Sequence, residues 1–406
     1  MSEIVTITGL GAEGDGAATT AGGAQIFIPQ ALPGEKWRFE EGYAAEPEDL
    51  LLDRRRPPDP NDEPCGGCVA RHMPLAMYRD WKVEFLVRAL RQHGVAAEIQ
   101  PLVAVPEHSR RRATFNARRE AGAVRIGYHG RRSHDLVAAD DCPVLDARIV
   151  ALLPALADLA SVAMSGTDTT RVVVTMTDTG ADVDVEGDET GLTARLRTRI
   201  SDIAAMARLA RVSIGGMPVI VRQAPVLHFA GKAVTPPPGV FLQAVPQAEE
   251  AMIDLVTAGI GKSKTVGDLF CGLGTLTLPI ARKARVMAFD SDRAAIDALN
   301  EAQRKNQGLK PITAQVRDLF SDPLAPLEMK DLDAVVLDPP RAGAKAQCER
   351  LAKSKIKRVV MVSCNPATLA RDLRILIDGG YRLDAITPID QFLYSPHLEA
   401  VAVLAR

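Results

Sequence analysis

Three apolar, strand-like segments in the last part of the chain each end in residues with chemical function. They lead into Cys271-Gly272-Leu273-Gly274, Asp338-Pro339-Pro340-Arg341 and Ser363-Cys364-Asn365-Pro366. In an open parallel sheet, ligands bind at the carboxyl ends of the strands, where such residues would lie. The pattern therefore predicts an α/β domain whose site is formed at these strand ends.

Strand-like and helical segments alternate through this region. We expect strands at 265–269, 285–289, 312–316, 333–337 and 357–362, and helices at 276–283, 293–307, 347–354 and 368–378. Two further strands, at 381–388 and 399–404, would close the sheet antiparallel.

The glycine turn at 272–274 permits close approach of a nucleotide-type ligand, and Asp290 is placed to accept its ribose hydroxyls. A nicotinamide site would need a similar turn, so the glycines alone do not identify the ligand.

The preceding residues form two further units. Residues 1–50 contain short alternating segments separated by glycines, which predicts a small β-barrel. Residues 51–235 combine a helical pattern over Leu75–Gln92 with strand-like segments, which predicts an α+β middle domain. The run Pro236-Pro237-Pro238-Gly239 marks the boundary to a third domain over residues 236–406.

The composition is that of an ordinary soluble protein, with 47% hydrophobic and 25% charged residues among 406. The N-terminus lacks the basic and apolar regions of a secretory signal, and no stretch approaches the about 20 apolar residues that span a bilayer. We therefore expect a cytoplasmic protein without membrane contact, and we expect a monomer. In the cytoplasm its six cysteines would be thiols, metal ligands or nucleophiles rather than disulfides.

Positive charge is concentrated in one part of the chain. Between Arg71 and Arg132 there are 13 Lys and Arg but only 5 Asp and Glu, although the whole chain has a net charge of −2. Arginine clusters at 110–112, 118–119 and 131–132 lie among alternating segments that read as adjacent strands. Such clusters can be a solvated face, or they can bind the phosphates and bases of RNA. We favour an RNA-binding face.

Taken together, these segments resemble the RNA 5-methyluridine methyltransferase family, and in particular its 23S ribosomal RNA branch. The resemblance covers nearly the whole chain. The matching motifs are Asp268-Leu269-Phe270-Cys271-Gly272-Leu273-Gly274, Asp338-Pro339-Pro340-Arg341-Ala342-Gly343, Ser363-Cys364-Asn365-Pro366-Ala367-Thr368-Leu369-Ala370-Arg371-Asp372 and Asp390-Gln391-Phe392 with His397-Leu398-Glu399. The branch joins an N-terminal TRAM barrel and an iron–sulfur middle domain to a Rossmann-like S-adenosylmethionine methyltransferase domain.

The resemblance implies S-adenosylmethionine as the cofactor and RNA as the partner, with 23S rRNA preferred. Cofactor positions of the family match Gln243, Phe270, Asp290 and Asp338, and we expect Gly272, Gly274, Thr275 and Asp318 to line the same cleft.

Uracil C5 becomes nucleophilic only after something adds to C6, and a thiolate is suited to that attack. Cys364, between a strand end and a helix start whose partial positive charge favours a thiolate, is the expected nucleophile. The family match makes Glu399 the base that removes the C5 proton. The alternative for Cys364 is a buried structural thiol, and for Glu399 a surface carboxylate on the last hairpin.

The expected metal site is where this sequence departs most from the family pattern. The family holds a 4Fe–4S cluster on four cysteines, of which Cys65, Cys68 and Cys142 are present here, while Asp59 occupies the first position. Thiolates normally supply all four bonds to such a cluster. Three interpretations compete: a cluster with Asp59 or an outside ligand on the fourth iron, a zinc site, or free thiols. We favour the cluster.

Other functions fit parts of the pattern. The Asp-Pro-Pro motif would also suit methylation of an exocyclic amine, and a related enzyme could act on cytosine C5, but Cys364 together with Glu399 favours uracil C5. The RNA could be transfer RNA, or the chain could be a non-catalytic RNA-binding factor in ribosome assembly. Leu393 and Ser395 stand where proline and threonine are usual, but Glu399 stays in register.

Overall fold

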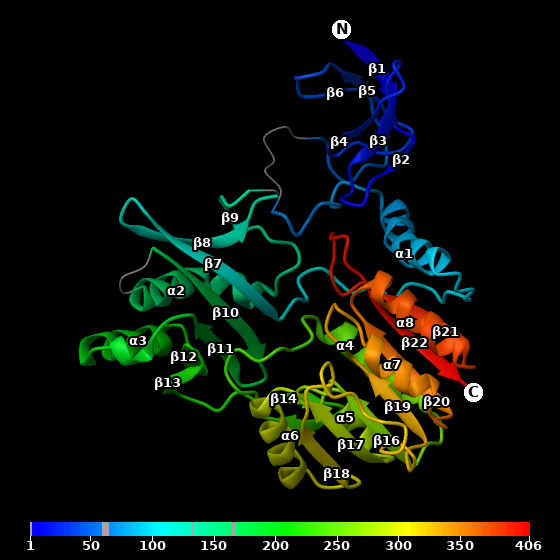
Figure 1. Cartoon of the computed structure of the whole chain (residues 1–406). Coiled ribbons are helices and arrows are strands. Elements are labelled where there is room, and N and C mark those ends of the chain that lie inside the picture. The colour runs from blue at the N-terminus through cyan, green and yellow to red at the C-terminus, as the bar shows by residue number, and fades with distance from the viewer. Residues whose placement is uncertain (1, 59–64, 132, 165–167) are drawn as a thin grey trace.

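The computed structural model describes residues 2–58, 65–131, 133–164 and 168–406 (Figure 1). Within them, two seven-stranded sheets form the body of the molecule, and two smaller three-stranded sheets lie near the N-terminus. In Figure 1 the N-terminal strands lie at the top, with the middle sheet and the C-terminal sheet side by side below them. None of the helices in these residues combines the length and the apolar character needed to cross a membrane.

The C-terminal sheet has the strand order β18-β17-β16-β19-β20-β22-β21. Its strands are β16 (Thr265–Leu269), β17 (Arg285–Asp290), β18 (Ile312–Val316), β19 (Ala334–Leu337), β20 (Arg358–Ser363), β21 (Arg382–Ile389) and β22 (Glu399–Ala405). The first five strands in the spatial order are parallel, and β22 lies antiparallel between β20 and β21. The chain leaves β16 toward β17 on one side and later returns to β19 on the other, which is the switch point where open sheets bind ligands. The predicted parallel sheet with an antiparallel close is confirmed.

Helices cover both faces of this sheet. They are α1 (Leu75–Gln92), α4 (Pro246–Gly259), α5 (Thr277–Ala281), α6 (Arg293–Lys305), α7 (Lys345–Ala352) and α8 (Pro366–Asp378). Because side chains alternate along a strand, Val336 and Val360 pack with α4, α5 and α6, whereas Val335 and Val359 pack with α1, α7 and α8. Helix α1 precedes the C-terminal region by more than 140 residues, so periodicity did not reveal that it packs on this sheet.

The middle sheet has the order β13-β12-β11-β10-β7-β8-β9. Its strands are β7 (Arg112–Glu120), β8 (Ala123–His129), β9 (Leu136–Ala138), β10 (Thr169–Thr177), β11 (Gly180–Val185), β12 (Arg211–Ile214) and β13 (Met217–Val221). Helices α2 (Ala147–Ala163) and α3 (Ala194–Met206) share one core with it, and a short 3-10 turn, η1 (Glu189–Gly191), precedes α3. The ribbon of β14 (Leu227–Phe229) and β15 (Lys232–Val234) leads on toward α4.

The N-terminal strands are short and antiparallel. One sheet contains β1 (Glu3–Thr6), β5 (Lys36–Phe39) and β6 (Glu46–Asp49), and the other contains β2 (Gly9–Leu10), β3 (Gly16–Thr19) and β4 (Gln25–Ile28). Val5, Ile28 and Trp37 are among the side chains of their small core. A Cβ on Gly16 would lie 2.7 Å from Ala31, so only glycine fits there. The arrangement is consistent with the predicted barrel-like unit.

Candidate active site

A cavity of about 430 Å³ opens at the carboxyl ends of β16, β17, β19 and β20. Of the residues expected from the sequence, it is lined by Gln243, Phe270, Gly272, Thr275, Asp290, Asp318, Asp338, Cys364 and Glu399. Gly274 is the one expected cleft residue that does not line it. The fold therefore gathers residues from seven separate segments around one space.

The turn after β16 shows what each glycine does. Phe270 and Gly272 have positive φ angles of 63° and 51°, and the turn they form brings the Gly272 N–H within 2.8 Å of Asp290 Oδ2. No atom lies within 4 Å of the position that a Cβ on Gly272 would take. A Cβ on Gly274 would lie 2.5 Å from Leu299 Cδ1 on α6. Gly274 is thus required for helix packing rather than for ligand approach.

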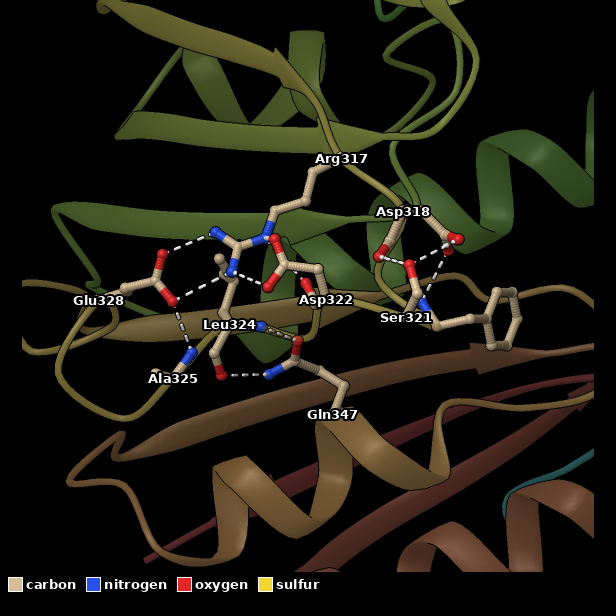
Figure 2. A network of polar contacts seen from close by, with 9 residues as sticks. Arg317, Asp318, Ser321, Asp322, Leu324, Ala325, Glu328 and Gln347 are labelled. Atoms are coloured by element: carbon tan, nitrogen blue, oxygen red, sulfur yellow. Dashed lines mark hydrogen bonds and ion pairs between the residues drawn. The ribbon is translucent and has the colours of Figure 1, made fainter.

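The connection after β18 forms another wall. Arg317 donates hydrogen bonds to the Asp322 carbonyl at 2.8 Å and to Glu328 Oε1 at 2.6 Å (Figure 2). The Asp318 carboxylate accepts bonds from the backbone N–H of Phe320 at 2.9 Å and from Ser321 Oγ at 2.8 Å. These bonds stabilise a compact turn that presents both Asp318 and Phe320 to the cavity.

The Phe320 ring lies 5.4 Å from the Phe270 ring, so two aromatic side chains meet at the cavity wall. Of this segment, sequence reasoning identified Asp318 but neither Arg317 nor Phe320, because the turn that brings them to the cavity is formed by tertiary hydrogen bonds.

Strand pairing places the expected nucleophile beside the expected base. In the register of β20 and β22, Ser363 pairs with Ala400, so the next residues outward are Cys364 and Glu399. Two hydrogen bonds to the Arg341 carbonyl, from Asn365 Nδ2 at 3.0 Å and from Thr368 Oγ1 at 3.2 Å, tie the loop after β19 to the start of α8. Three strand ends are thereby held as one unit.

A chain of buried side chains connects Glu399 with Asp338. Gln391 Nε2 donates to Gln243 Oε1 at 2.8 Å and to Glu399 Oε1 at 3.3 Å, and Gln243 Nε2 donates to Asp338 Oδ2 at 3.3 Å. Glu399 is only 4% exposed, which excludes the surface-carboxylate interpretation. Gln391 belongs to a family motif, but its role as the link between the two carboxyl groups required the tertiary structure.

Burial alters the acidity of all three reactive groups. It raises the pKa of Glu399 well above its usual range, and nearby Asp338 adds to this effect. Burial also raises the pKa of Asp338 to about 7, against the Gln243 hydrogen bond. The pKa of the Cys364 thiol is raised to about 11 by burial and then by Glu399 and Asp338, while Arg341 acts in the opposite direction. In the unliganded protein, desolvation and the two carboxyl groups outweigh the effect expected from the helix start, so the pKa is raised rather than lowered.

The arginine clusters are divided by the structure. Strands β7 and β8 are adjacent, as expected, and Arg118 pairs with Arg125 across them. Arg111, however, forms a buried ion pair with Glu249 at 2.7 Å. Arg131 likewise binds Asp15, at 2.6 Å. Arg132 lies outside the described residues. Only the arginines that face solvent therefore remain candidates for the single basic face expected from the sequence.

The three expected metal-binding cysteines lie in one region, where burial raises the pKa of Cys68 to about 12 and nearby Cys142 and Cys65 raise it further. Arg71 and Arg110 lower it, so two guanidinium groups lie near the same thiols. The fourth expected ligand, Asp59, lies outside the described residues. In the part of the chain that the structure describes, no group of three or more His, Cys, Asp or Glu side chains is arranged to hold a metal ion. The described residues thus do not by themselves fit a 4Fe–4S cluster.

Comparisons with known proteins place this geometry in context. A model of the tRNA (uracil-5-)-methyltransferase family matches residues 78–406. The chain is 43% identical to an uncharacterized RNA methyltransferase of Agrobacterium fabrum, with all of both chains covered. It is 30% identical to the 23S rRNA (uracil(1939)-C(5))-methyltransferase of Halomonas elongata, over 98% of this chain and 89% of that protein.

Among solved structures, the chain resembles the tRNA (uracil-54, C5)-methyltransferase of Pyrococcus abyssi in complex with S-adenosyl-L-homocysteine. The TM-score is 0.72 at 20% identity, and both chains are fully covered. This likeness shows a shared methyltransferase fold.

Proposed function

Since this chain belongs to the family of RNA (uracil-5-)-methyltransferases, which use S-adenosylmethionine, we propose that it methylates C5 of a uridine in 23S ribosomal RNA. The observation that carries the proposal is the placement of Cys364 and Glu399 side by side at the cavity that Gly272, Asp290 and Asp338 also line. The choice of 23S rRNA is supported by the relative from Halomonas elongata.

The cavity suits the methyl donor. Its volume of about 430 Å³, the close backbone approach at Gly272 and the carboxylates of Asp290 and Asp318 are what a ligand with adenine, ribose and amino-acid parts requires. When bound, S-adenosylmethionine supplies an electrophilic methyl group. Gln243 and Asp338, which are hydrogen-bonded to each other and line the same cavity as Cys364, would orient the uracil and the donor toward each other.

In the proposed reaction, the Cys364 thiolate attacks C6 of the uracil and forms a C–S bond, which makes C5 nucleophilic. C5 then takes the methyl group. The Glu399 carboxylate removes the proton left on C5, and the electron pair released expels the thiolate from C6. The products are 5-methyluridine, the demethylated donor and one proton. Glu399 must be ionised for its step, so Gln391, which donates a hydrogen bond to its carboxylate, supports the form that accepts the proton.

The test of this mechanism uses Cys364→Ala and Glu399→Gln. Cys364→Ala should abolish methyl transfer and leave donor affinity nearly unchanged. RNA with 5-fluorouridine at the target should form a stable adduct with the wild-type protein, because fluorine does not leave as a proton does. Full activity in Cys364→Ala would exclude the mechanism, whereas a wild-type protein that binds RNA without methylating it would favour the non-catalytic role.

The substrate is tested separately. Mass-spectrometric mapping of 5-methyluridine in ribosomal and transfer RNA, from cells with and without this protein, should show loss of one site in 23S rRNA. Loss of a site in transfer RNA instead would show that the alternative substrate is correct. The proposal also includes a TRAM-like role in RNA binding for residues 1–50, a cytoplasmic location and a monomeric state.

A 4Fe–4S cluster remains a further part of the proposal. It is supported by the proximity of the thiols of Cys65, Cys68 and Cys142 and by the guanidinium groups of Arg71 and Arg110 near them, which would balance a negatively charged cluster. A fourth ligand would have to come from Asp59 or from outside the chain. No step of the proposed reaction depends on the cluster.

A further inference from the structure

The nine residues between β21 and β22, numbers 390–398, form the loop that leads directly into Glu399. This loop is held by a buried lysine from a distant part of the chain. Lys82, on α1, is fully buried, and its Nζ donates hydrogen bonds to the carbonyls of Phe392 at 3.0 Å, Ser395 at 2.9 Å and His397. The same ammonium group forms an ion pair with Asp390 at 2.8 Å.

A buried tyrosine one turn earlier on α1 completes the arrangement. Tyr78 donates its hydroxyl hydrogen to Asp390 Oδ2 at 2.6 Å and accepts a hydrogen bond from the Tyr394 N–H at 2.9 Å. The Tyr394 carbonyl in turn accepts a bond from the Ala70 N–H at 3.0 Å. We call Tyr78, Lys82 and Asp390 the loop clamp. It engages both ends of the loop and its middle.

The helix that carries the clamp is itself fixed to the catalytic sheet. Further along α1, Leu86 and Leu90 are buried in the core that also contains α7 and α8. Burying an ammonium group is costly unless it is fully paired, so a position that satisfies three carbonyls and one carboxylate defines a single loop conformation. Any other path of residues 390–398 would leave the Lys82 charge unsatisfied.

We propose that Lys82 and Tyr78 are positioning residues for Glu399. The proposal rests on the role of Glu399 as the base that removes the C5 proton. By fixing the loop from Asp390 to His397, the clamp sets where β22 begins, and so where the Glu399 carboxyl group lies relative to Cys364. Contacts from helix α1 would thus affect the last chemical step of the reaction.

The clamp also explains a departure from the family pattern. Leu393 and Ser395 stand where the family usually has proline and threonine, yet the contacts from Lys82 are made to backbone carbonyls. Side-chain changes in the loop therefore leave those contacts in place. Ser395 keeps a local turn through its own hydroxyl, which donates to the Phe392 carbonyl at 2.9 Å.

The experiment compares Tyr78→Phe and Lys82→Met with a matched control, Tyr381→Phe. Tyr381 is another buried tyrosine in the core of the same sheet, and its hydroxyl donates to the Ile356 carbonyl at 2.8 Å, away from the cavity. For each full-length variant we would measure thermal melting, donor affinity, KM for RNA, kcat, and the amount of covalent enzyme–RNA adduct formed with unmodified RNA.

The expected result is a selective loss of the last step. Tyr78→Phe and Lys82→Met should leave donor affinity and KM nearly unchanged and lower kcat by at least about tenfold, since a displacement of about 1 Å can cost about 100-fold. They should also accumulate adduct, as Glu399→Gln should, because attack and methylation precede the step that fails. Tyr381→Phe should lower the melting temperature without accumulating adduct.

Several outcomes would overturn the inference. If Tyr78→Phe only lowers the melting temperature, as Tyr381→Phe should, the clamp has a structural role only. In that case kcat would be unchanged and no adduct would accumulate. If Glu399→Gln accumulates adduct and the clamp variants do not, the proposed function stands and the positioning role fails. If Glu399→Gln itself accumulates no adduct and turns over normally, the role of Glu399 fails and the positioning role fails with it. Should Lys82→Met not fold, Tyr78→Phe decides alone.

Discussion

At the scale of single residues, the site contains a thiol and a carboxyl group whose pKa values differ from those of the exposed groups. In the unliganded protein, burial raises the pKa of Cys364 to about 11 and the pKa of Glu399 well above its usual range. Both must ionise for the proposed reaction, so the site is prepared for chemistry only when substrates change its surroundings. A positively charged donor is the change expected to favour the charged forms.

Alkylation of Cys364 by iodoacetamide should follow this raised pKa. With a pKa of about 11, the thiolate fraction at pH 8 is small, and the labelling rate should keep rising through pH 10. An unperturbed cysteine would level off near its usual pKa of about 8.5. Labelling is followed at the Cys364 peptide by mass spectrometry. Glu399→Gln removes one of the causes and should move the curve to lower pH, whereas a plateau below pH 8 in the wild type would contradict the assignment.

Gly274 and Gly272 offer a second test at this scale. Gly274→Ala should cost more stability than Gly272→Ala, because only the first places a Cβ against Leu299, at 2.5 Å. Overpacking of this kind costs about 1–3 kcal/mol, in addition to about 1–2 kcal/mol for an alanine with positive φ. Denaturant unfolding measures the difference. Equal losses would mean that Leu299 moves aside freely. In a Leu299→Ala background, the added cost of Gly274→Ala should fall, whereas the added cost of Gly272→Ala should not change.

At the scale of secondary-structure elements, the arginines of β7 and its neighbours have different roles. Arg111, just before β7, is paired with Glu249 of α4 and joins the middle sheet to the catalytic region. Arg118 and Arg125 lie opposite each other and are partly exposed, and both form surface ion pairs with Glu120. Arg118 also donates a hydrogen bond to the His134 carbonyl at 2.8 Å. Such surface pairs contribute little to stability and can be exchanged for phosphate contacts.

Replacing Arg118 and Arg125 by Gln should therefore weaken RNA binding and reduce the slope of log affinity against log salt by about two, or about one for each lost phosphate contact. Arg111→Gln should leave that slope unchanged. It should lower stability by about 3–5 kcal/mol, as expected when a buried pair loses one partner. Binding titrations at several salt concentrations and thermal melting measure the two effects. An equal slope in the double variant and the parent would make β7 and β8 a solvated face only.

At the scale of the whole molecule, one cluster of apolar side chains joins parts that are far apart in sequence. One core contains Leu32 from the connection between β4 and β5, Met73, Tyr78 and Trp81 from the region of α1, and Tyr394 from the loop before Glu399. Trp81 Nε1 also donates to the Gly11 carbonyl at 3.1 Å. Cys68 packs at the edge of this cluster, so the cysteine region is next to the helix that holds the catalytic loop.

Because of that position, a metal bound by these cysteines would lie close to the helix that holds the catalytic loop. Its presence can be tested directly. We expect anaerobically purified protein to contain iron and sulfide and to be brown, and we expect Cys65→Ser or Cys68→Ser to remove the colour. Asp59→Cys should make the cluster more resistant to air, since a thiolate binds its iron more firmly than a carboxylate. Metal analysis and visible absorption are the measurements. Stoichiometric zinc, or no metal with unchanged folding, would show that one of the other two interpretations is correct.

The sequence by itself determined the features that depend on local pattern. The strand ends that carry Gly272, Asp338 and Cys364 could be predicted because alternating βαβ segments dictate a parallel sheet, and a parallel sheet brings its carboxyl ends to one edge. The strands at 265–269 and 312–316 are confirmed at both ends. Glu399 followed from a motif.

Only the tertiary structure decided which residues that are far apart in sequence contact each other. Gln391 and Gln243 are 148 residues apart, and Lys82 reaches carbonyls more than 300 residues away. Tertiary packing likewise assigned Gly274 to α6, paired Arg111 with Glu249 and raised the pKa of Cys364. The physical reason is that periodicity reports which face of an element is buried, whereas pairing and desolvation depend on which other element covers that face.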